Sequence, residues 1–435
     1  MNTTVLRALR PLLLASALAG CAVEPSPGVS PDLLAVEAGA DPARSLVLMR
    51  AQAERFAHRP FLADNAVELL VNGPASFAAL GEAIRSARTR IDMESYEFDT
   101  VAGGEFAALL LAARVRGVEV NLVYDGWGAA STPAALFDRL RAGGVRVLEF
   151  NPLTPNGRVP VDVNRRDHRK LLCVDGRLAI TGGVNISKVY QNTAGAGAGD
   201  PNDEAWRDTD VRIEGPVVAQ FERYFLQTWR GQHGPALADP PAAPGAGSGA
   251  GPGGVEVLAI DGAPDNGQPL IYRTMLATIA LARRSVHLTT GFFVPTPDLV
   301  GALQAAARRG VDVQVIVPGR STSGAALAGG RATYGALLEA GVGVHEYQGR
   351  ILHAKTAVVD GAFSAVGSSN LDWRSTVWNN EIDAVILGEG FGGRMEAMFA
   401  ADVAASRTIG LAAWRRRGLG ERLREMEARL VGRLL

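Results

Sequence analysis

Short segments in which β-branched and other apolar residues alternate with polar ones recur in pairs along the chain. Such alternation is typical of β-strands with one buried face. Each expected strand follows an Ala-, Leu- and Arg-rich segment that is predicted to be helical, and a Gly at several junctions ends the helix. The predicted strands lie at residues 91–98, 116–123 and 144–150, and again at 285–293, 309–316 and 341–347.

The pairing of these segments indicates two copies of one structural unit rather than a solenoid of short repeats. Strands that alternate with helices of this length predict parallel pairing within an α/β fold. A stretch dominated by Gly, Ala and Pro separates the copies and is typical of a linker. The predicted organisation is a leader at residues 1–20, a tether and lead-in at 21–60, a first domain at 61–230, a linker at 231–254, a second domain at 255–410 and an amphipathic helix at 411–435.

The leader is typical of an export signal. Arg7 and Arg10 precede an apolar run of about ten residues, which is too short to span a membrane. The run ends in Leu-Ala-Gly-Cys21, which resembles the bacterial lipobox, so we expect Cys21 to be acylated and to become the mature N-terminus. Ala22 follows Cys21, and this resembles the signal for sorting to an outer membrane. Anchoring in the inner membrane is the alternative. We therefore expect an exported lipoprotein anchored on the periplasmic side.

The composition of the 435 residues excludes several classes of protein. Acidic and basic residues number 45 and 44, so the chain has no overall positive field to attract nucleic acid. The two cysteines exclude a disulfide scaffold and a Cys-rich zinc protein. Of the basic residues 41 are Arg and three are Lys, at positions 170, 188 and 355. A lysine that persists against this bias toward Arg is a candidate for specific chemistry.

Two of these lysines stand in a motif that each copy carries once. The motif is His-x-Lys followed by an Asp, and a tight Gly turn that ends in Asn comes next. On a strand, residues two apart project to the same face, so each His and Lys share one space. The matching positions are His168, Lys170, Asp175 and Asn185 in the first copy, and His353, Lys355, Asp360 and Asn370 in the second.

The residue types in this motif predict chemistry on a phosphodiester. The ammonium groups of Lys170 and Lys355 and the amides of Asn185 and Asn370 can bind the non-bridging oxygens. One imidazole can attack phosphorus while the other protonates the departing alkoxide. Neither copy supplies both imidazoles, which explains why the unit is duplicated. The residues themselves do not say which His is the nucleophile.

These paired motifs resemble those of the phospholipase D superfamily. The segments 164–170, 182–185 and 367–375 further resemble its bacterial cardiolipin synthase branch, and the likeness spans roughly residues 65–430. It implies two similar phospholipase D-like α/β domains related by pseudo-twofold symmetry, with mixed, mainly parallel sheets flanked by helices and a single active site between them. It also implies a covalent phosphohistidine intermediate, with no metal and no cofactor. By analogy, His168 is the nucleophile and His353 is the general acid.

The family also places a carboxylate behind each His, where it holds the ring and stabilises the imidazolium. Glu381 fits this position 28 residues after His353, and Asp208 is comparable 40 residues after His168. A Gly- and Ala-rich insertion at residues 192–203 accounts for the difference in spacing. A surface salt bridge is the alternative interpretation of Asp208.

The remaining candidates have structural alternatives. Asp175 and Asp360 are expected to support the turn of the motif rather than to react, although they belong to it. Ser187 and Ser369 either add hydrogen bonds to the phosphate or are polar turn residues. Four aromatic residues near the expected strand ends either line an entrance for acyl chains or belong to the core. These residues are Tyr96, Phe98, Phe292 and Phe293.

The resemblance implies a phosphatidyltransferase of the cardiolipin synthase type. His168 would attack the phosphodiester of one phospholipid, and the hydroxyl of a second lipid, expected to be phosphatidylglycerol, would accept the phosphatidyl group. Hydrolysis by a phospholipase D, with water as the acceptor, uses the same residues and stays open.

Two further alternatives are disfavoured. The near-neutral charge argues against a nuclease, and the presence of all eight motif residues argues against a lipid-binding lipoprotein without activity. The expected partners are phospholipids and, through lipidated Cys21, the membrane surface, with no nucleic acid. The expected state is a monomer.

Overall fold

The computed structural model describes residues 41–154, 162–191, 205–239, 254–263, 269–418, 420, 421 and 425. After the N-terminal helix α3 (Pro42–Ala57), the first half contains β1 (Leu62–Val71), α4 (Gly73–Ser86), β2 (Arg90–Ser95), α5 (Thr100–Val115), β3 (Glu119–Asp125), α6 (Ala134–Ala142), β4 (Arg146–Phe150), β5 (Arg166–Asp167), β6 (Lys170–Val174), β7 (Leu178–Gly182), α7 (Lys188–Gln191), β8 (Thr209–Glu214) and α8 (Val218–Gly231).

The second half follows a similar order, with a few short strands that differ and with further elements at its end. It contains β9 (Val255–Gly262), α9 (Leu270–Leu281), β10 (Ser285–Thr289), β11 (Phe293–Val294), α10 (Pro297–Arg308), β12 (Asp312–Pro318), α11 (Gly324–Glu339), β13 (Gly343–Tyr347), β14 (Thr356–Val359), β15 (Phe363–Gly367), β16 (Leu371–Asp372), α12 (Trp373–Val377), β17 (Asn379–Leu387), α13 (Glu389–Ala404), β18 (Ser406–Thr408) and α14 (Leu411–Arg415).

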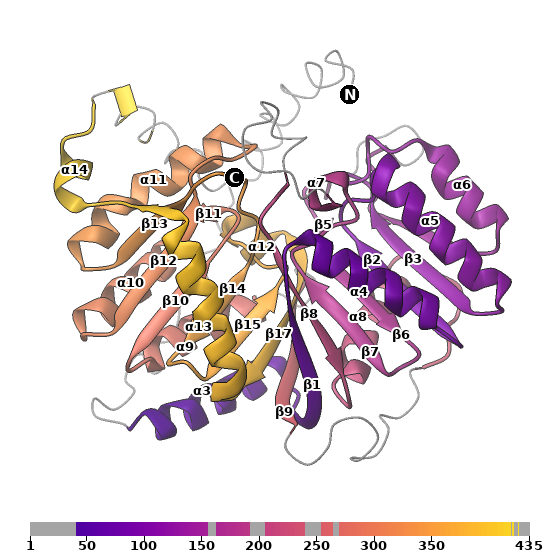
Figure 1. Cartoon of the computed structure of the whole chain (residues 1–435), viewed down its shortest axis with the longest axis horizontal. Helices are drawn as coiled ribbons and strands as arrows, with labels where there is room; N and C mark the ends of the chain where they lie inside the picture. The colour runs from indigo at the N-terminus through magenta and orange to yellow at the C-terminus, as the bar shows by residue number, and fades with distance from the viewer. Residues whose placement is uncertain are drawn as a thin grey trace.

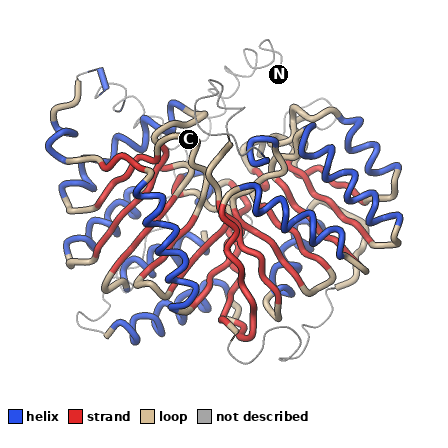
Figure 2. Tube along the Cα trace, viewed as in Figure 1, coloured by secondary structure: helices blue, strands red, loops and turns tan. Residues whose placement is uncertain are grey.

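The strand order shows that the two halves are copies of one unit. The first half has the order β1-β8-β7-β6-β2-β3-β4, and the second has β9-β17-β15-β14-β10-β12-β13, with β18 added at its edge. Strands β1 and β9 pair in antiparallel fashion and join the two sheets into one continuous sheet. Figure 1 shows the two halves side by side, and Figure 2 shows the strands as a central layer covered by helices. The expected α/β fold of two similar halves is confirmed.

The balance of strand directions differs from the expectation of mainly parallel sheets. In the continuous sheet, parallel pairs join only β2 to β3, β3 to β4, β10 to β12 and β12 to β13, and the other described neighbours along its strand order are antiparallel. The reason is a hairpin in each motif. Asp175 and Gly176 both have positive φ, as do Asp360 and Gly361, and two such residues in succession form the turn that reverses a strand tightly.

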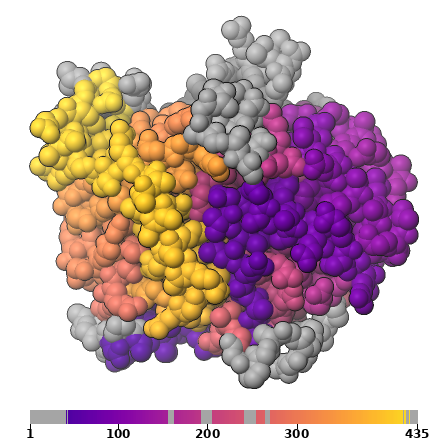
Figure 3. Space-filling model, in the orientation of Figure 1, coloured from indigo at the N-terminus to yellow at the C-terminus, as the bar shows by residue number. Residues whose placement is uncertain are grey.

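Helices cover both faces of each half and bury the apolar side chains of the strands. In the first half α4, α5 and α6 pack together over β2 and β3, with Ile91, Leu110 and Leu122 fully buried among them. In the second half α9, α10 and α11 form the corresponding layer. A third core joins side chains of both halves with α8 and α13. Figure 3 shows the yellow α13 lying against the indigo first half, where the Arg394 guanidinium donates to the Val67 carbonyl.

Helix α3 lies within the segment expected to be a tether and lead-in. It packs on α9 of the second half, where Met49 and Ala53 are buried, and Arg50 pairs with Glu256 at 2.8 Å. The apolar spacing of these residues places them on one helix face, so the helix is ordered by packing. Residues 42–57 of the predicted tether and lead-in therefore belong to the folded second half.

The helix predicted at 411–435 is interrupted within the described residues, because helix α14 ends at Arg415 and residues 416–418 are not helical. Helix α14 is short, and Trp414 packs against the Tyr334 ring, with centroids 5.0 Å apart. The leader, Cys21 and the insertion at 192–203 lie outside the described residues. Among the helices of the part that the structure describes, none is long and apolar enough to cross a membrane.

Candidate active site

Both motif histidines lie at the junction of the two halves. His168 stands between β5 and β6, at the edge of the sheet where the parallel strands β2 and β3 end, and His353 stands in the equivalent place before β14. The backbone of each His is held by the opposite half, because the His168 N–H donates to the Asn380 carbonyl and the His353 N–H donates to the Arg207 carbonyl. The two rings lie 6.4 Å apart between centroids. The structure therefore brings both motifs into one site.

Each ring is held by a carboxylate from the opposite half. His168 Nδ1 lies 3.0 Å from a Glu381 oxygen, and His353 Nδ1 lies 2.7 Å from Asp208 Oδ2. Both carboxylates are fully buried. Asp208 is therefore a buried partner of a histidine and not part of a surface salt bridge. Because Nδ1 faces a carboxylate in both rings, Nε2 is the nitrogen left for reaction.

Two serines of the second half also bind Glu381. The Ser368 hydroxyl donates to Oε2 at 2.5 Å, and the Ser375 hydroxyl donates to Oε1 at 2.7 Å. The Asn379 amide reaches Oε1 at 3.3 Å. Burial would raise the pKa of Glu381, but His168, Lys170 and the Ser368 hydroxyl lower it. The carboxylate is therefore ionised and shares its charge among several donors.

Asp208 has a different set of neighbours. Its Oδ1 accepts the Thr209 N–H at 2.8 Å, and the Tyr190 hydroxyl lies 3.0 Å from Nδ1 of His353. Burial would raise the pKa of Asp208, but His353, Lys355 and the Thr209 N–H lower it. The sequence interpretation missed Tyr190, Ser368 and Ser375. Tyr190 and Ser375 each stand five residues after the motif Asn, so a closer comparison of the two copies could have found them.

The two motif lysines are buried beside their histidines. The Lys170 ammonium donates to the His168 carbonyl at 2.6 Å, and the Lys355 ammonium donates to the His353 carbonyl. Burial lowers the pKa of Lys170 to about 8, although Glu381 opposes this effect. Burial lowers the pKa of Lys355 to about 7, with Asp208 opposing and Lys170 reinforcing the shift. An anionic phosphate between these ammonium groups would offset their desolvation.

Desolvation also acts on the two imidazoles. Burial lowers the pKa of His168 to about 4, because the loss of hydration outweighs the attraction of Glu381. Burial lowers the pKa of His353 to about 3, and the Lys355 ammonium acts in the same direction while Asp208 opposes it. Both rings are therefore neutral near pH 7 until a negative charge enters the site.

The two motif asparagines differ in their contacts. Asn185 Oδ1 accepts the Glu97 N–H at 3.2 Å, and its amide nitrogen lies 3.4 Å from the Tyr190 hydroxyl. Asn370 Oδ1 accepts the Phe292 N–H at 3.2 Å. Both amides lie at the site, and Asn185 is engaged on both sides by protein groups.

The motif aspartates lie at the hairpin turns, away from the reacting groups. Asp175 accepts the backbone N–H groups of residues 88–90, and Asp360 accepts those of residues 283–285. Ser187 is buried, and its N–H donates to the Asn185 carbonyl. The Ser369 N–H donates to Asp383 at 3.3 Å. The geometry of the two aspartates is that of turn supports.

Of the four aromatic residues near the strand ends, two contact the motif histidines and two lie in the cores. The Tyr96 ring meets the His168 ring at 5.0 Å, and the Phe292 ring meets the His353 ring at 6.3 Å. Phe98 and Phe293 are buried in the cores of the two halves. Among the described residues, no group of three or more His, Cys, Asp or Glu side chains could hold a metal ion.

The family comparison identifies this arrangement. The family model described as "Cardiolipin synthase, PLD-like domain" matches residues 80–229 and 275–403. The chain belongs to this family of the phospholipase D superfamily. It is therefore an enzyme of that superfamily, and its two PLD-like domains correspond to the two halves of the structure.

Individual relatives agree with the family. The chain is 36% identical over 356 residues to cardiolipin synthase A of Pseudomonas aeruginosa, covering 81% of this chain and 70% of that protein. It is 31% identical over 389 residues to the cardiolipin synthase of Geobacillus thermodenitrificans, covering 88% and 75%. The crystal structure of phosphatidylserine synthase from Haemophilus influenzae superposes with a TM-score of 0.65 at 14% identity, covering 89% of this chain and 100% of that chain. This last likeness concerns the fold.

Proposed function

We propose that the protein transfers a phosphatidyl group between two phospholipids through a covalent phosphohistidine, with phosphatidylglycerol as donor and acceptor and cardiolipin as product. The observation that carries this proposal is the pair of imidazoles 6.4 Å apart, each backed by a buried carboxylate. The relatives named cardiolipin synthase support the choice of lipid.

In the first step Nε2 of His168 attacks the phosphorus of the donor, and the bond from phosphorus to the glycerol head group breaks. His353, charged when the phosphodiester anion lies beside it, gives its Nε2 proton to the departing alkoxide. Glu381 stabilises the positive charge on phosphorylated His168 through Nδ1. Lys170 and Lys355 balance the charge of the non-bridging oxygens.

The second step reverses the first with a different alcohol. The hydroxyl of the acceptor lipid gives its proton to Nε2 of His353 and attacks phosphorus. The bond from phosphorus to His168 breaks, and the ring returns to its neutral form. The products are cardiolipin and the free glycerol of the first step, so atoms and protons balance.

We also propose that the mature protein is a lipoprotein held at the periplasmic side of a membrane by an acylated Cys21. The leader and its Leu-Ala-Gly-Cys21 motif support this proposal. A segment of about twenty residues joins Cys21 to α3 and can extend to roughly 70 Å at full stretch. A monomer is proposed because one chain supplies both histidines and both carboxylates.

The test incubates the purified full chain with radiolabelled phosphatidylglycerol and resolves the lipid products. Cardiolipin is the expected product of the wild type, and His168→Ala is expected to lose both turnover and the labelled phosphoenzyme trapped by acid quenching. Phosphatidic acid as the sole product would instead show hydrolysis. Unchanged turnover by His168→Ala would refute the mechanism.

A further inference from the structure

Most of the large apolar side chains that stand exposed among the described residues lie at one edge of the sheet. This edge, which we call the site edge, is the one where β2, β3, β10 and β12 end and where both motif histidines lie. Seven large apolar side chains of the described part are 38–89% exposed. Five of these stand at the site edge, namely Val71, Val101, Trp127, Val377 and Trp378, and the other two are Val47 and Val115.

The strand pairings place these residues beside the motif residues. Trp127 follows the end of β3 by two residues, and Trp378 directly precedes β17. Both strands contact β5, the short strand that leads into His168. Val71 ends β1 and pairs with the first residue of β8, which follows Asp208 directly. The exposed apolar residues thus come from both halves and share the site edge with the reacting groups.

Arginines stand at the same edge. Arg320 follows β12 by two residues, Arg350 follows β13 by three, and Arg374 belongs to α12. Trp side chains are enriched at the boundary between lipid head groups and hydrocarbon, and guanidinium groups bind phosphate oxygens. Exposed apolar residues together with such arginines are typical of a surface that lies on a bilayer.

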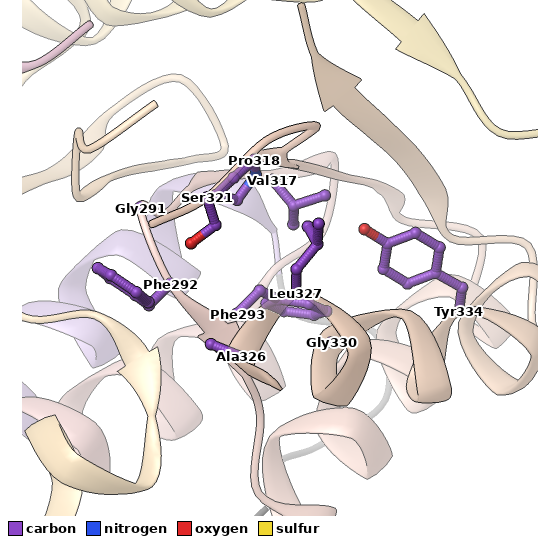
Figure 4. Close-up of a pocket in the computed structure, with 10 residues that line it drawn as sticks. All are labelled: Gly291, Phe292, Phe293, Val317, Pro318, Ser321, Ala326, Leu327, Gly330 and Tyr334. Atoms are coloured by element: carbon purple, nitrogen blue, oxygen red, sulfur yellow. The ribbon is translucent and has the colours of Figure 1, made fainter. Parts of the chain in front are cut away.

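Two pockets near the motifs are too small for lipid chains. One lies in the second half, where Phe292 and Tyr334 are among its lining residues (Figure 4), and the other lies against Lys170 in the first half. Each has room for about one water molecule. A phospholipid whose phosphate lies between the histidines therefore keeps its acyl chains outside both pockets, which favours a bilayer placed against the site edge.

We propose that the site edge docks on the surface of a phospholipid bilayer, with Trp127, Trp378 and Val101 in the boundary between head groups and hydrocarbon. The inference rests on the proposed function, since both lipids of the transfer reaction come from a bilayer. Burial of the exposed parts of these side chains stabilises the docked state, and the arginines add attraction to anionic head groups. A docked site receives donor and acceptor from the same bilayer, and neither lipid has to cross open water.

The proposed anchor at Cys21 does not by itself turn the site toward the bilayer. The described chain begins with α3, and the Ser45 hydroxyl of this helix accepts from the guanidinium of Arg283 at 3.3 Å. The Arg283 N–H donates to Asp360, at the hairpin turn on the edge opposite the site edge. A tether attached there limits the distance to the bilayer but leaves the orientation free. Docking by the site edge supplies that orientation.

The first test uses α5, which has an exposed valine at each end. Val101 lies in its first turn at the site edge and is 54% exposed, and Val115 is its last residue, at the opposite edge, and is 89% exposed. Val101→Glu and Val115→Glu therefore form a matched pair. The full chain of each variant and of the wild type is assayed on phosphatidylglycerol in vesicles and on short-chain phosphatidylglycerol dispersed as single molecules.

On vesicles we expect Val101→Glu to lower the rate of phosphatidylglycerol consumption about tenfold, because a carboxylate opposes burial at the head groups of an anionic bilayer. Val115→Glu should stay within about twofold of the wild type. On the dispersed lipid all three proteins should react at equal rates, which shows that site and fold are intact. Equal rates of the two variants on vesicles, or an equal loss by Val101→Glu on both forms of the lipid, would overturn docking. A wild type that consumes neither form would refute the proposed function itself, so the two failures are distinguishable.

A second measurement detects contact with the bilayer directly. Phosphatidylglycerol with brominated acyl chains quenches the fluorescence of tryptophans that it contacts, and Trp127 and Trp378 are the most exposed tryptophans among the described residues. The double variant Trp127→Phe, Trp378→Phe keeps both positions apolar and is expected to lose most of the quenching seen in the wild type. Unchanged quenching in the double variant would overturn the placement of these residues in the bilayer surface.

Discussion

The two halves place a histidine, a lysine and an asparagine in matching positions, but they surround the two carboxylates with different groups. Glu381 accepts hydrogen bonds from the hydroxyl groups of Ser368 and Ser375. On the other side, Gly183 stands where the second half has Ser368, and an added Cβ there would lie 2.1 Å from Asp208 Oδ1. Tyr190 stands where the second half has Ser375, and its hydroxyl lies beside His353.

This difference shows how a duplicated unit can perform two different steps. The shared backbone sets the position of each ring, because the strand register and the hairpin turns are common to both halves. The side chains behind the rings then make the two sites chemically unequal. Four groups donate hydrogen bonds to the Glu381 carboxylate, so its interaction with His168 is shared with three other donors. The Asp208 carboxylate accepts from the Thr209 N–H and His353, so fewer donors share its charge.

The largest effect is expected when either carboxylate is neutralised. Glu381→Gln and Asp208→Asn should each lower kcat by about 10³- to 10⁴-fold, because an amide neither stabilises an imidazolium nor selects its tautomer. A donor with a nitrophenol leaving group needs no general acid. It should rescue phosphoenzyme formation in Asp208→Asn but not in Glu381→Gln, as rapid-quench measurements would show. Equal rescue of both variants contradicts distinct roles.

Replacement by alanine is expected to lower kcat more at Gly183 than at the matching residue Ser368. Gly183→Ala should lower kcat by about 100-fold, because the new methyl group displaces Asp208 from His353. Ser368→Ala keeps the space and removes one hydroxyl donor, so about a tenfold loss is expected. Steady-state kinetics measure both, with thermal unfolding as the folding control. A Gly183→Ala enzyme as active as Ser368→Ala would show that the close approach is unimportant.

The two lysines are expected to cause the fall in kcat/KM at high pH, each over its own pH range. Lys355 and Lys170, with pKa values of about 7 and about 8, lose their charges in turn as the pH rises. The free enzyme then attracts a phosphodiester less, so kcat/KM of the wild type should fall about tenfold between pH 7 and about pH 8. In Lys355→Met the residual kcat/KM should begin to fall only near pH 8. If kcat/KM of Lys355→Met still began to fall at pH 7, the first fall could not be due to Lys355.

The smallest effect is expected from the two hydroxyl groups that follow the asparagines. Tyr190→Phe and Ser375→Ala each remove one hydrogen bond, so a threefold to tenfold loss in kcat is expected. The nitrophenol donor should abolish the loss in the phosphoenzyme step for Tyr190→Phe, because that residue acts through His353. The loss in Ser375→Ala should persist with this donor. The reverse pattern would exchange the roles of the two histidines.

The sequence carried enough information to predict the paired site, but it did not show which groups pair. His168, Lys170, His353 and Lys355 were predictable because their spacing repeats in both copies. The hairpins at the Asp-Gly pairs, which make most of the sheet antiparallel, were not predicted, and mainly parallel sheets were expected instead. The exchange of carboxylates between the halves was not predictable from spacing, since Glu381 is near His353 along the chain but binds His168.

The sequence by itself therefore determined the duplicated α/β unit, the reacting residue types and the family, because these depend on local periodicity and on motifs of a few residues. Only the tertiary structure decided which carboxylate holds which ring, and that Tyr190, Ser368 and Ser375 belong to the site. The contacts of the carboxylates and of Tyr190 with the rings join residues 145 to 213 positions apart, and their chemistry depends on distances that no local pattern encodes.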